Sequence, residues 1–259
     1  MSKIHPTAIV NGKAKLGDNI EIAPYVIIEE DVEIGDDCYI GPHSVIYNGA
    51  RIKNRVKIFQ SASVAHTPQD FSFKGEESVF IVEDDTTIRE FVTLHRGTRS
   101  TGFSKVGKNC FLMAYAHVAH DCSVGDNCIL TNGVQIGGHV TLEDYVIIGG
   151  LTPVHQFCRV GQHSMIGGGF RITQDVPPYI LGASEPLKYS GVNSIGLRRR
   201  GFSNDDIFLL KKAYSFIYDN SLNVSQAKDK IINEIGTENI YIKNVLDFIN
   251  ASKRGLIGK

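Results

Sequence analysis

Aliphatic residues return every six positions along the first two-thirds of the chain. The series runs in one phase from Ile4 to Ile172, and only Asp70, Glu76 and Ser100 break it. Helices repeat every 3.6 residues and strands every 2, so neither element explains this period. A six-residue period is typical of a parallel β-helix, in which three short strands form one triangular coil. The series predicts roughly ten coils of about 18 residues each.

The position two residues before each aliphatic residue is mostly small or β-branched. Two inward side chains at this spacing fit one short strand, because alternate residues share a face. Every cysteine occupies this second position, and the chain has no CxxC motif, so we predict buried, unpaired core residues rather than metal ligands or disulfides. They are Cys38, Cys110, Cys122, Cys128 and Cys158.

Glycines recur one residue after the aliphatic position. Gly17, Gly35 and Gly107 are examples. We expect these glycines to supply corner conformations that other residues resist.

Two segments leave the period and predict loops. Residues 65–81 and 95–105 are rich in charged residues, glycine and serine. We therefore assign residues 1–185 to a β-helix with two loops, where function usually lies.

Residues 186–259 predict a connector and a small C-terminal α-helical domain. Ser203 and Asp206 resemble a helix N-terminal capping box. Apolar residues follow at helical spacing after it, and further helices are expected at about 225–235 and 240–252. We expect this domain to cap the open end of the β-helix, because the last coil would otherwise expose its core.

Composition excludes some classes of partner. The formal net charge of the 259 residues is −1, which favours neither nucleic acid nor an anionic membrane. The sequence has no apolar run of 18 residues, so no membrane span is predicted. The N-terminus lacks the apolar segment of a signal peptide, which makes a cytoplasmic location the expectation.

A group of polar residues falls outside the inward positions. Because residues 18 apart stack in successive coils, position 120 lies under position 138, and position 138 lies under position 156. We therefore expect a polar strip along one edge of the β-helix, and convergent polar groups of this kind usually mark a site. The strip consists of His120, Asp121, Gly138, His139, His155 and Gln156.

Two chemistries suit this strip. A neutral imidazole can accept a hydroxyl proton, with Asp121 orienting it and a backbone N–H of Gly137–Gly138 serving an oxyanion. Alternatively, three imidazoles can hold zinc with an open fourth position.

The basic tract at 198–201 precedes the predicted helix start at Ser203. Cations at a helix N-terminus oppose the macrodipole, so we predict an anionic partner such as a phosphate or carboxylate.

Ordered motifs along nearly the whole chain resemble the UDP-N-acetylglucosamine O-acyltransferase family. They are QD…KGE at 69–76, LHRGT at 94–98, AHVAHDC at 116–122, GGH at 137–139, VHQFC at 154–158, QDVPPY at 174–179 and GVNSIGLRRRGF at 191–202. The resemblance implies a left-handed β-helix, although the usual crossover rule would favour a right-handed one. It also implies a homotrimer with sites between subunits and no cofactor.

The resemblance further implies the reaction. The family transfers a 3-hydroxyacyl chain from acyl carrier protein to the 3-hydroxyl of UDP-N-acetylglucosamine, the first step of lipid A biosynthesis. His120 would be the general base, with Asp121 supporting it and the Gly138 N–H binding the oxyanion. The residues implied to contact substrate are Asp70, Ser72, Lys74, His117, His139, His155, Gln156, Gly168, Asn193, Arg199 and Arg200. Among these, Gly168 would bound the acyl chain and the last three would hold the nucleotide.

The chain departs from the family at a few positions. Ser72 stands where the family often has lysine, and Lys74 is the nearest cation that could replace it. Ile195 and Pro186 stand where some members have a glutamate and a histidine. The basic residues implied to dock the acidic carrier protein are Lys211, Lys212, Lys253 and Arg254.

Three alternatives remain open. The first is a zinc-dependent hydratase of the same fold. The second is the paralogous UDP-3-O-acylglucosamine N-acyltransferase, which usually carries an extra N-terminal uridine-binding domain, whereas the repeats here begin at Ile4. The third is a structural or binding β-helix without activity.

Overall fold

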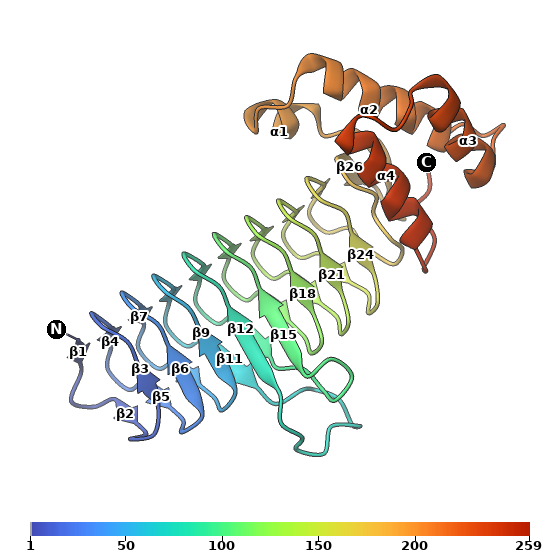
Figure 1. The fold of residues 1–259 in the computed structure, drawn as a ribbon. Helices are drawn as coiled ribbons and strands as arrows, with labels where there is room; N and C mark the ends of the chain where they lie inside the picture. The colour runs from blue at the N-terminus through green and yellow to red at the C-terminus, as the bar shows by residue number, and fades with distance from the viewer. Residues whose placement is uncertain (1) are drawn as a thin grey trace.

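The chain winds through three parallel sheets in turn, as the six-residue period predicts. The computed structural model describes residues 2–259, and within them the three sheets contain 11, 8 and 8 strands. Residues of successive coils pair in register, for example Ile4 with Ile22 and Val118 with Ile136. The fold is a left-handed parallel β-helix with a helical C-terminus (Figure 1), so the predicted fold class is confirmed.

The strands of sheet 1 come first in each coil, followed by those of sheet 2 and sheet 3. Sheet 1 contains β1 (Lys3–Ile4), β4 (Glu21–Ile22), β7 (Tyr39–Ile40), β10 (Lys57–Ile58), β13 (Thr87–Ile88), β16 (Phe111–Leu112), β19 (Ile129–Leu130), β22 (Ile147–Ile148), β25 (Met165–Ile166), β26 (Ile180–Ala183) and β27 (Lys188–Val192). Sheet 2 contains β2 (Ile9–Val10), β5 (Ile27–Ile28), β8 (Val45–Ile46), β11 (Ser63–His66), β14 (Thr93–His95), β17 (His117–Val118), β20 (Gln135–Ile136) and β23 (Pro153–Val154). Sheet 3 contains β3 (Lys15–Leu16), β6 (Val32–Ile34), β9 (Ala50–Ile52), β12 (Val79–Val82), β15 (Phe103–Val106), β18 (Ser123–Val124), β21 (Thr141–Leu142) and β24 (Arg159–Val160).

The corners between these sheets give three edges, named here edge 1–2, edge 2–3 and edge 3–1. At most corners, the residue three after the aliphatic position has a positive φ. Examples are Asn19 (φ 55°), Asp121 (φ 59°) and Tyr145 (φ 60°). The left-handed conformation therefore falls mostly on residues that are not glycine.

The cysteines are buried and unpaired, as the repeat predicts. All five are free, and each is at most 2% exposed. Their thiols also bond to backbone, as where Cys122 Sγ donates to the Gly137 carbonyl of the next coil over 3.1 Å. Burial raises the pKa of Cys122 to about 12, so this thiol stays neutral.

The glycines after the aliphatic position serve close packing, so the conformational reason expected for them is wrong. A Cβ on Gly35 would lie 2.4 Å from Asn54 Oδ1 and 2.9 Å from the Lys53 carbonyl carbon, and a Cβ on Gly107 would meet the next coil just as closely. Glycine is required because successive coils touch there, whereas the positive φ occurs two residues later.

Both loops leave the β-helix at edge 2–3 (Figure 1). The first follows β11 and ends before β12, and the second follows β14 and ends before β15. They cover residues 67–78 and 96–102, which is less than the expected 65–81 and 95–105, because the flanking strands extend into those ranges. The two loops therefore emerge from adjacent coils on the same edge.

A β-hairpin joins the end of the β-helix to a C-terminal domain of four helices. The hairpin pairs β26 with β27 in antiparallel fashion. The helices are α1 (Ser194–Arg199), α2 (Asn204–Ile217), α3 (Val224–Glu234) and α4 (Ile240–Ala251). The capping box expected at Ser203 and Asp206 is present at the start of α2. The hairpin and α1 were not predicted.

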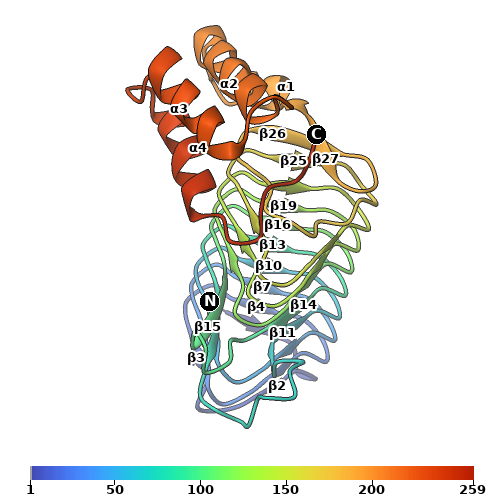
Figure 2. The same ribbon diagram turned by 90° about the vertical axis from the view of Figure 1, so that its right-hand side faces the viewer.

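The helical domain lies at the C-terminal end of the β-helix in both views (Figure 1 and Figure 2). Tyr214 in α2 donates to the Pro178 carbonyl over 2.5 Å, and Asn244 in α4 donates to the Tyr179 hydroxyl over 2.9 Å. No helix among residues 2–259 is long and apolar enough to cross a membrane.

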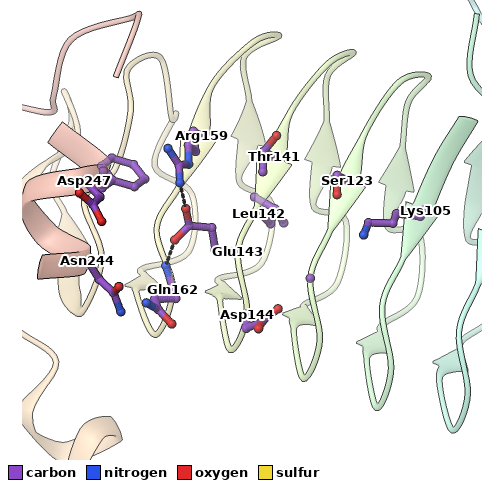
Figure 3. A pocket seen from close by; sticks show the side chains of 12 residues that line it. Lys105, Ser123, Thr141, Leu142, Glu143, Asp144, Arg159, Gln162, Asn244 and Asp247 are labelled. Atoms are coloured by element: carbon purple, nitrogen blue, oxygen red, sulfur yellow. Dashed lines mark hydrogen bonds and ion pairs between the residues drawn. The ribbon is translucent and has the colours of Figure 1, made fainter. Parts of the chain in front are cut away.

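A groove of about 400 Å³ separates sheet 3 from α4 (Figure 3). Arg159 crosses it, pairing with Glu143 and lying 4.6 Å from the centre of the Phe248 ring. Arg159 thus connects the β-helix to the helical domain across this groove. None of the residues that line the groove belongs to the predicted polar strip.

Candidate active site

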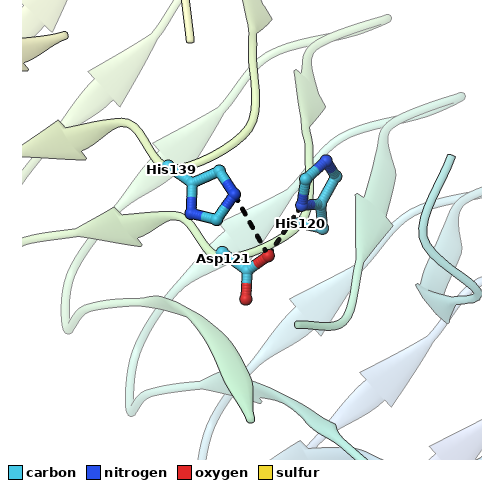
Figure 4. A group of neighbouring side chains, drawn as sticks. All are labelled: His120, Asp121 and His139. Atoms are coloured by element: carbon cyan, nitrogen blue, oxygen red, sulfur yellow. Dashed lines mark hydrogen bonds and ion pairs between the residues drawn. The ribbon is translucent and has the colours of Figure 1, made fainter. Parts of the chain in front are cut away.

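The corner after β17 brings His120 and Asp121 to edge 2–3. The two residues fall two and three positions after the inward Val118, so neither is needed in the core. His120 and His139 both point toward the Asp121 carboxylate (Figure 4). The polar strip expected from the stacking of positions 120, 138 and 156 is present in the structure.

Asp121 is enclosed by hydrogen-bond donors, and its side chain has no solvent exposure. Oδ1 accepts from the Thr98 amide over 3.0 Å and from the Thr101 hydroxyl over 2.5 Å, and Oδ2 accepts from the Thr98 hydroxyl over 2.9 Å. Burial by itself raises the pKa of Asp121, but the hydrogen bonds from Thr101, His120 and Thr98 outweigh it and hold the pKa below its usual value. Asp121 is therefore an anion at neutral pH.

His120 is positioned with one ring nitrogen bound and the other open. Nδ1 lies 2.7 Å from Asp121 Oδ2. An ionised carboxylate only accepts hydrogen bonds, so Nδ1 carries a proton, and in the neutral imidazole Nε2 then has the free lone pair. Nε2 faces Asp70 Oδ2 at 3.8 Å, beyond hydrogen-bond distance. The imidazole thus has the tautomer of a general base.

Gly138 lies directly against the His120 ring. A Cβ at this position would be 2.7 Å from both Cε1 and Nε2 of His120, so only glycine leaves the imidazole in place. The next residue, His139, has its Nε2 at 3.6 Å from Asp121 Oδ2 and stacks on Phe157 with ring centres 4.5 Å apart. The Gly138 backbone thus lies beside His120 Nε2, which makes its N–H a candidate oxyanion donor.

Asp70 reaches the site from the loop 67–78. Its Oδ1 accepts from the Ser72 amide over 2.8 Å, and hydrogen bonds from Ser72 hold the pKa of Asp70 below its usual value. The expected substitute cation, Lys74, turns its Nζ to the Phe71 carbonyl at 3.0 Å. Lys74 therefore braces its own loop in this structure and does not reach the His120 ring.

The other predicted histidines lie near the site but in different surroundings. Burial, aided by the charges of His95 and His120, lowers the pKa of His117 to about 4, so this imidazole is neutral at pH 7. Its Nδ1 lies 2.8 Å from the Thr93 hydroxyl. His155 and Gln156 are exposed one coil further along the edge. Both can therefore meet a ligand that lies along edge 2–3.

The predicted nucleotide-binding residues lie over a different edge. Asn193 Nδ2 donates to the His163 carbonyl over 3.0 Å, and Arg200 Nη1 lies 3.2 Å from His163 Nδ1. His163 belongs to edge 3–1, because it follows β24. Gly168 follows β25 and lies on edge 1–2. Within one chain, the predicted site residues are therefore divided among three edges.

The structure also corrects the electrostatic reason given for the basic tract. Arg198 and Arg199 form the last turn of α1, so they lie at the C-terminus of one helix as well as before the N-terminus of α2. The macrodipole favours cations there. The expectation of an anionic partner is thus not supported by helix electrostatics, although the exposed Arg199 remains free to meet a ligand.

His120, Asp121 and His139 are close enough together to suggest a metal site, with ligand atoms within 4.8 Å of one another. The donor set does not fit one. Both oxygens of Asp121 already accept hydrogen bonds from Thr98, Thr101 and His120. This arrangement orients a histidine base and leaves no carboxylate lone pair directed at a shared ion.

Sequence reasoning missed Thr98 and Thr101, which provide most of the contacts to Asp121. Both belong to the loop 96–102, which leaves the six-residue period. No stacking rule could align that loop with position 121, because its path is set by contacts more than 18 residues apart in the chain.

Family models match both parts of the chain. The model described as Udp N-acetylglucosamine O-acyltransferase, domain 2, matches residues 175–257, and the bacterial transferase hexapeptide model matches residues 13–48 and 103–138. The first match covers the helical domain, and the second covers two parts of the β-helix.

Whole-length relatives agree with these matches. The acyl-[acyl-carrier-protein]–UDP-N-acetylglucosamine O-acyltransferase of Janthinobacterium sp. (strain Marseille) is 45% identical over 99% of this chain and 100% of its own length. The solved UDP-N-acetylglucosamine acyltransferase of Bacteroides fragilis is also 45% identical, with a TM-score of 0.96 over 98% of this chain and 99% of that one. The Arabidopsis enzyme is 30% identical, with a TM-score of 0.86 over 99% of this chain and 100% of that one. These names support neither the hydratase nor the N-acyltransferase, and the chain belongs to the UDP-N-acetylglucosamine O-acyltransferase family.

Proposed function

We propose that the protein transfers a 3-hydroxyacyl chain from acyl carrier protein to the 3-hydroxyl of UDP-N-acetylglucosamine, the first step of lipid A biosynthesis. The observation that carries this proposal is the His120 imidazole, whose Nδ1 is bound to the buried anion Asp121 and whose Nε2 is open. Relatives of 42–45% identity over nearly the whole chain bear the name of this reaction.

The proposed mechanism is a single acyl transfer. His120 Nε2 takes the proton of the sugar 3-hydroxyl as that oxygen attacks the thioester carbonyl. The Gly138 N–H donates to the oxyanion that forms. The tetrahedral intermediate then collapses, the carbon–sulfur bond breaks, and the imidazolium returns its proton to the departing thiolate. Asp121 stabilises the imidazolium throughout, as the acid does in Ser-His-Asp triads.

The substrate contacts proposed from the family follow the edges of the β-helix. Asp70, Ser72, Lys74, His117, His139, His155 and Gln156 would meet the sugar and the pantetheine arm on edge 2–3 or on the faces and loops beside it. Gly168 on edge 1–2 would bound the acyl chain. The nucleotide would be held by Asn193, Arg199 and Arg200. The side-chain oxygen Oδ1 of Asn193 already caps α1 by accepting from the Gly196 N–H.

We also propose that the protein is a homotrimer. Residues on three different edges of one β-helix cannot surround one substrate, whereas edges of neighbouring subunits can face each other around a threefold axis. A cytoplasmic location is proposed with it, since a nucleotide sugar and a carrier-bound thioester are cytoplasmic metabolites.

The direct test is an acyl transfer assay with UDP-N-acetylglucosamine and carrier proteins bearing 3-hydroxyacyl chains of graded length. We expect transfer to the sugar nucleotide, with a preference for one chain length. The control acceptor is the 3-deoxy sugar nucleotide, which lacks the attacking hydroxyl. Absence of transfer with every chain length would reject the proposed function.

The inter-subunit site can be tested by mixing two inactive variants. His120→Ala and Arg199→Ala remove residues from edge 2–3 and from the segment over edge 3–1. If each site takes its two residues from neighbouring subunits, refolded mixtures should recover activity, because each mixed trimer contains one intact site. Each variant refolded alone is the control. If the mixture is no more active than the separate variants, the site does not combine these two residues from different subunits.

A further inference from the structure

The loop 96–102 forms a binding pocket for the Asp121 carboxylate. It leaves the β-helix after β14, which pairs with the strand β17 that precedes His120. Three of the four donors to Asp121 come from this loop, and the fourth is His120. The carboxylate that orients the proposed base is therefore itself held by a segment outside the repeat.

Thr98 holds both oxygens of the carboxylate. Its amide donates to Oδ1 over 3.0 Å and its hydroxyl donates to Oδ2 over 2.9 Å. The Thr98 hydroxyl oxygen accepts from the Ser100 backbone N–H over 3.1 Å, which directs the hydroxyl hydrogen toward Asp121. Thr98 is only 5% exposed, so water does not compete freely for these bonds.

The two hydrogen bonds from Thr98 matter because other donors surround the Asp121 carboxylate. The Thr101 hydroxyl lies 2.5 Å from Oδ1, and His139 Nε2 lies 3.6 Å from Oδ2. Rotation of the carboxylate toward either group would lengthen the 2.7 Å contact with His120 Nδ1. The proton could then move to Nε2, and that tautomer cannot accept a proton from a substrate.

The same loop is tied to the one that carries Asp70. The Arg99 amide donates to Glu76 Oε1 over 3.1 Å, and the Lys74 amide donates to Glu76 Oε2 over 2.7 Å. The segment that contains Thr98 thus joins the two carboxylates on either side of the His120 ring.

We propose that Thr98 is a positioning residue, which fixes the Asp121 carboxylate so that His120 keeps its proton on Nδ1. This rests on the proposed role of His120 as general base. Thr98 itself touches no substrate, and its effect passes through Asp121.

Three variants test the proposal. Thr98→Val keeps the shape and removes the hydroxyl, Thr98→Ser restores the hydroxyl, and Ser100→Ala is the matched control in the same loop. We expect Thr98→Val to lower kcat about 10- to 100-fold with little change in KM, because a hydrogen bond to a charged group is lost. Thr98→Ser and Ser100→Ala should stay near wild type. If the valine variant does not fold, Thr98→Ala takes its place.

Nitrogen-15 NMR of labelled histidine gives a readout independent of turnover. Wild type should show His120 as one tautomer protonated at Nδ1, and Thr98→Val should show a mixture of both tautomers. An unchanged tautomer, or a wild-type kcat in an active Thr98→Val enzyme, would overturn the proposal. If the wild-type protein transfers no acyl chain, the proposed function fails. The tautomer of His120, measured by NMR, still decides whether Thr98 positions Asp121 and His120.

Discussion

We expect His120→Ala to lower kcat for acyl transfer by about 10²- to 10⁴-fold, which is the range typical of the loss of a general base. The reason is geometric. His120 has its Nδ1 bound to an anion and its Nε2 open beside Gly138. His117 cannot easily take over, because its Nδ1 faces the Thr93 hydroxyl and its pKa is about 4, which makes it a poor base.

The measurement is steady-state transfer from carrier-linked 3-hydroxyacyl chains, with folding checked by circular dichroism. His5→Ala is the matched control, since His5 is exposed near the N-terminus and contacts Thr7. It should leave kcat unchanged. Turnover of the His120→Ala protein near the wild-type rate would show that another group removes the proton.

Asp121→Asn is expected to reduce kcat by about 10²- to 10⁴-fold and also to destabilise the fold. In Ser-His-Asp triads the same Asp→Asn change leaves the imidazole in the wrong tautomer. Here an NH₂ group in place of Oδ1 would face the Thr98 backbone N–H, and one in place of Oδ2 would face the proton on His120 Nδ1, whereas the two threonine hydroxyls can turn and accept. A buried donor left without an acceptor costs about 1–3 kcal/mol, so the free energy of unfolding should fall by that amount.

Asp126→Asn is the matched control for this variant. Asp126 Oδ1 accepts from the Lys108 backbone N–H at a corner of edge 3–1, and the Asn54 side chain accepts in the same way from the Asp36 N–H three coils earlier. An amide is thus already tolerated in that role. Kinetics and urea unfolding should place Asp126→Asn close to wild type. An equal loss in both variants would mean that Asp121 contributes only to folding.

The arrangement of loops explains how a regular fold acquires a specific site. Each coil repeats the same inward residues, and its corners are free to vary. Both loops interrupt the repeat at edge 2–3, in the two coils that precede the His120 corner. A rigid scaffold with loops on one edge can hold the His120 imidazole and the Asp121 and Asp70 carboxylates at fixed distances.

Two expectations failed because they treated local sequence as sufficient. Gly35 and Gly107 looked like conformational residues, but their neighbours in the next coil determine the need for glycine. Arg198 and Arg199 were placed only before the helix capped by Ser203, because the six-residue α1 that they end is too short to show an amphipathic period. Both errors concern contacts or boundaries that a single periodic pattern does not encode.

By itself, the sequence determined the parallel β-helix, the burial of its cysteines, and the release of His120, Asp121 and Gly138 from core packing. These follow from periodicity, because one inward position every six residues repeats a local rule. Only the tertiary structure decided that Thr98 and Thr101 enclose Asp121 and that Asn193 and Arg200 lie over another edge. Those contacts join segments through irregular loops and corners, where the path of the chain depends on packing rather than on period.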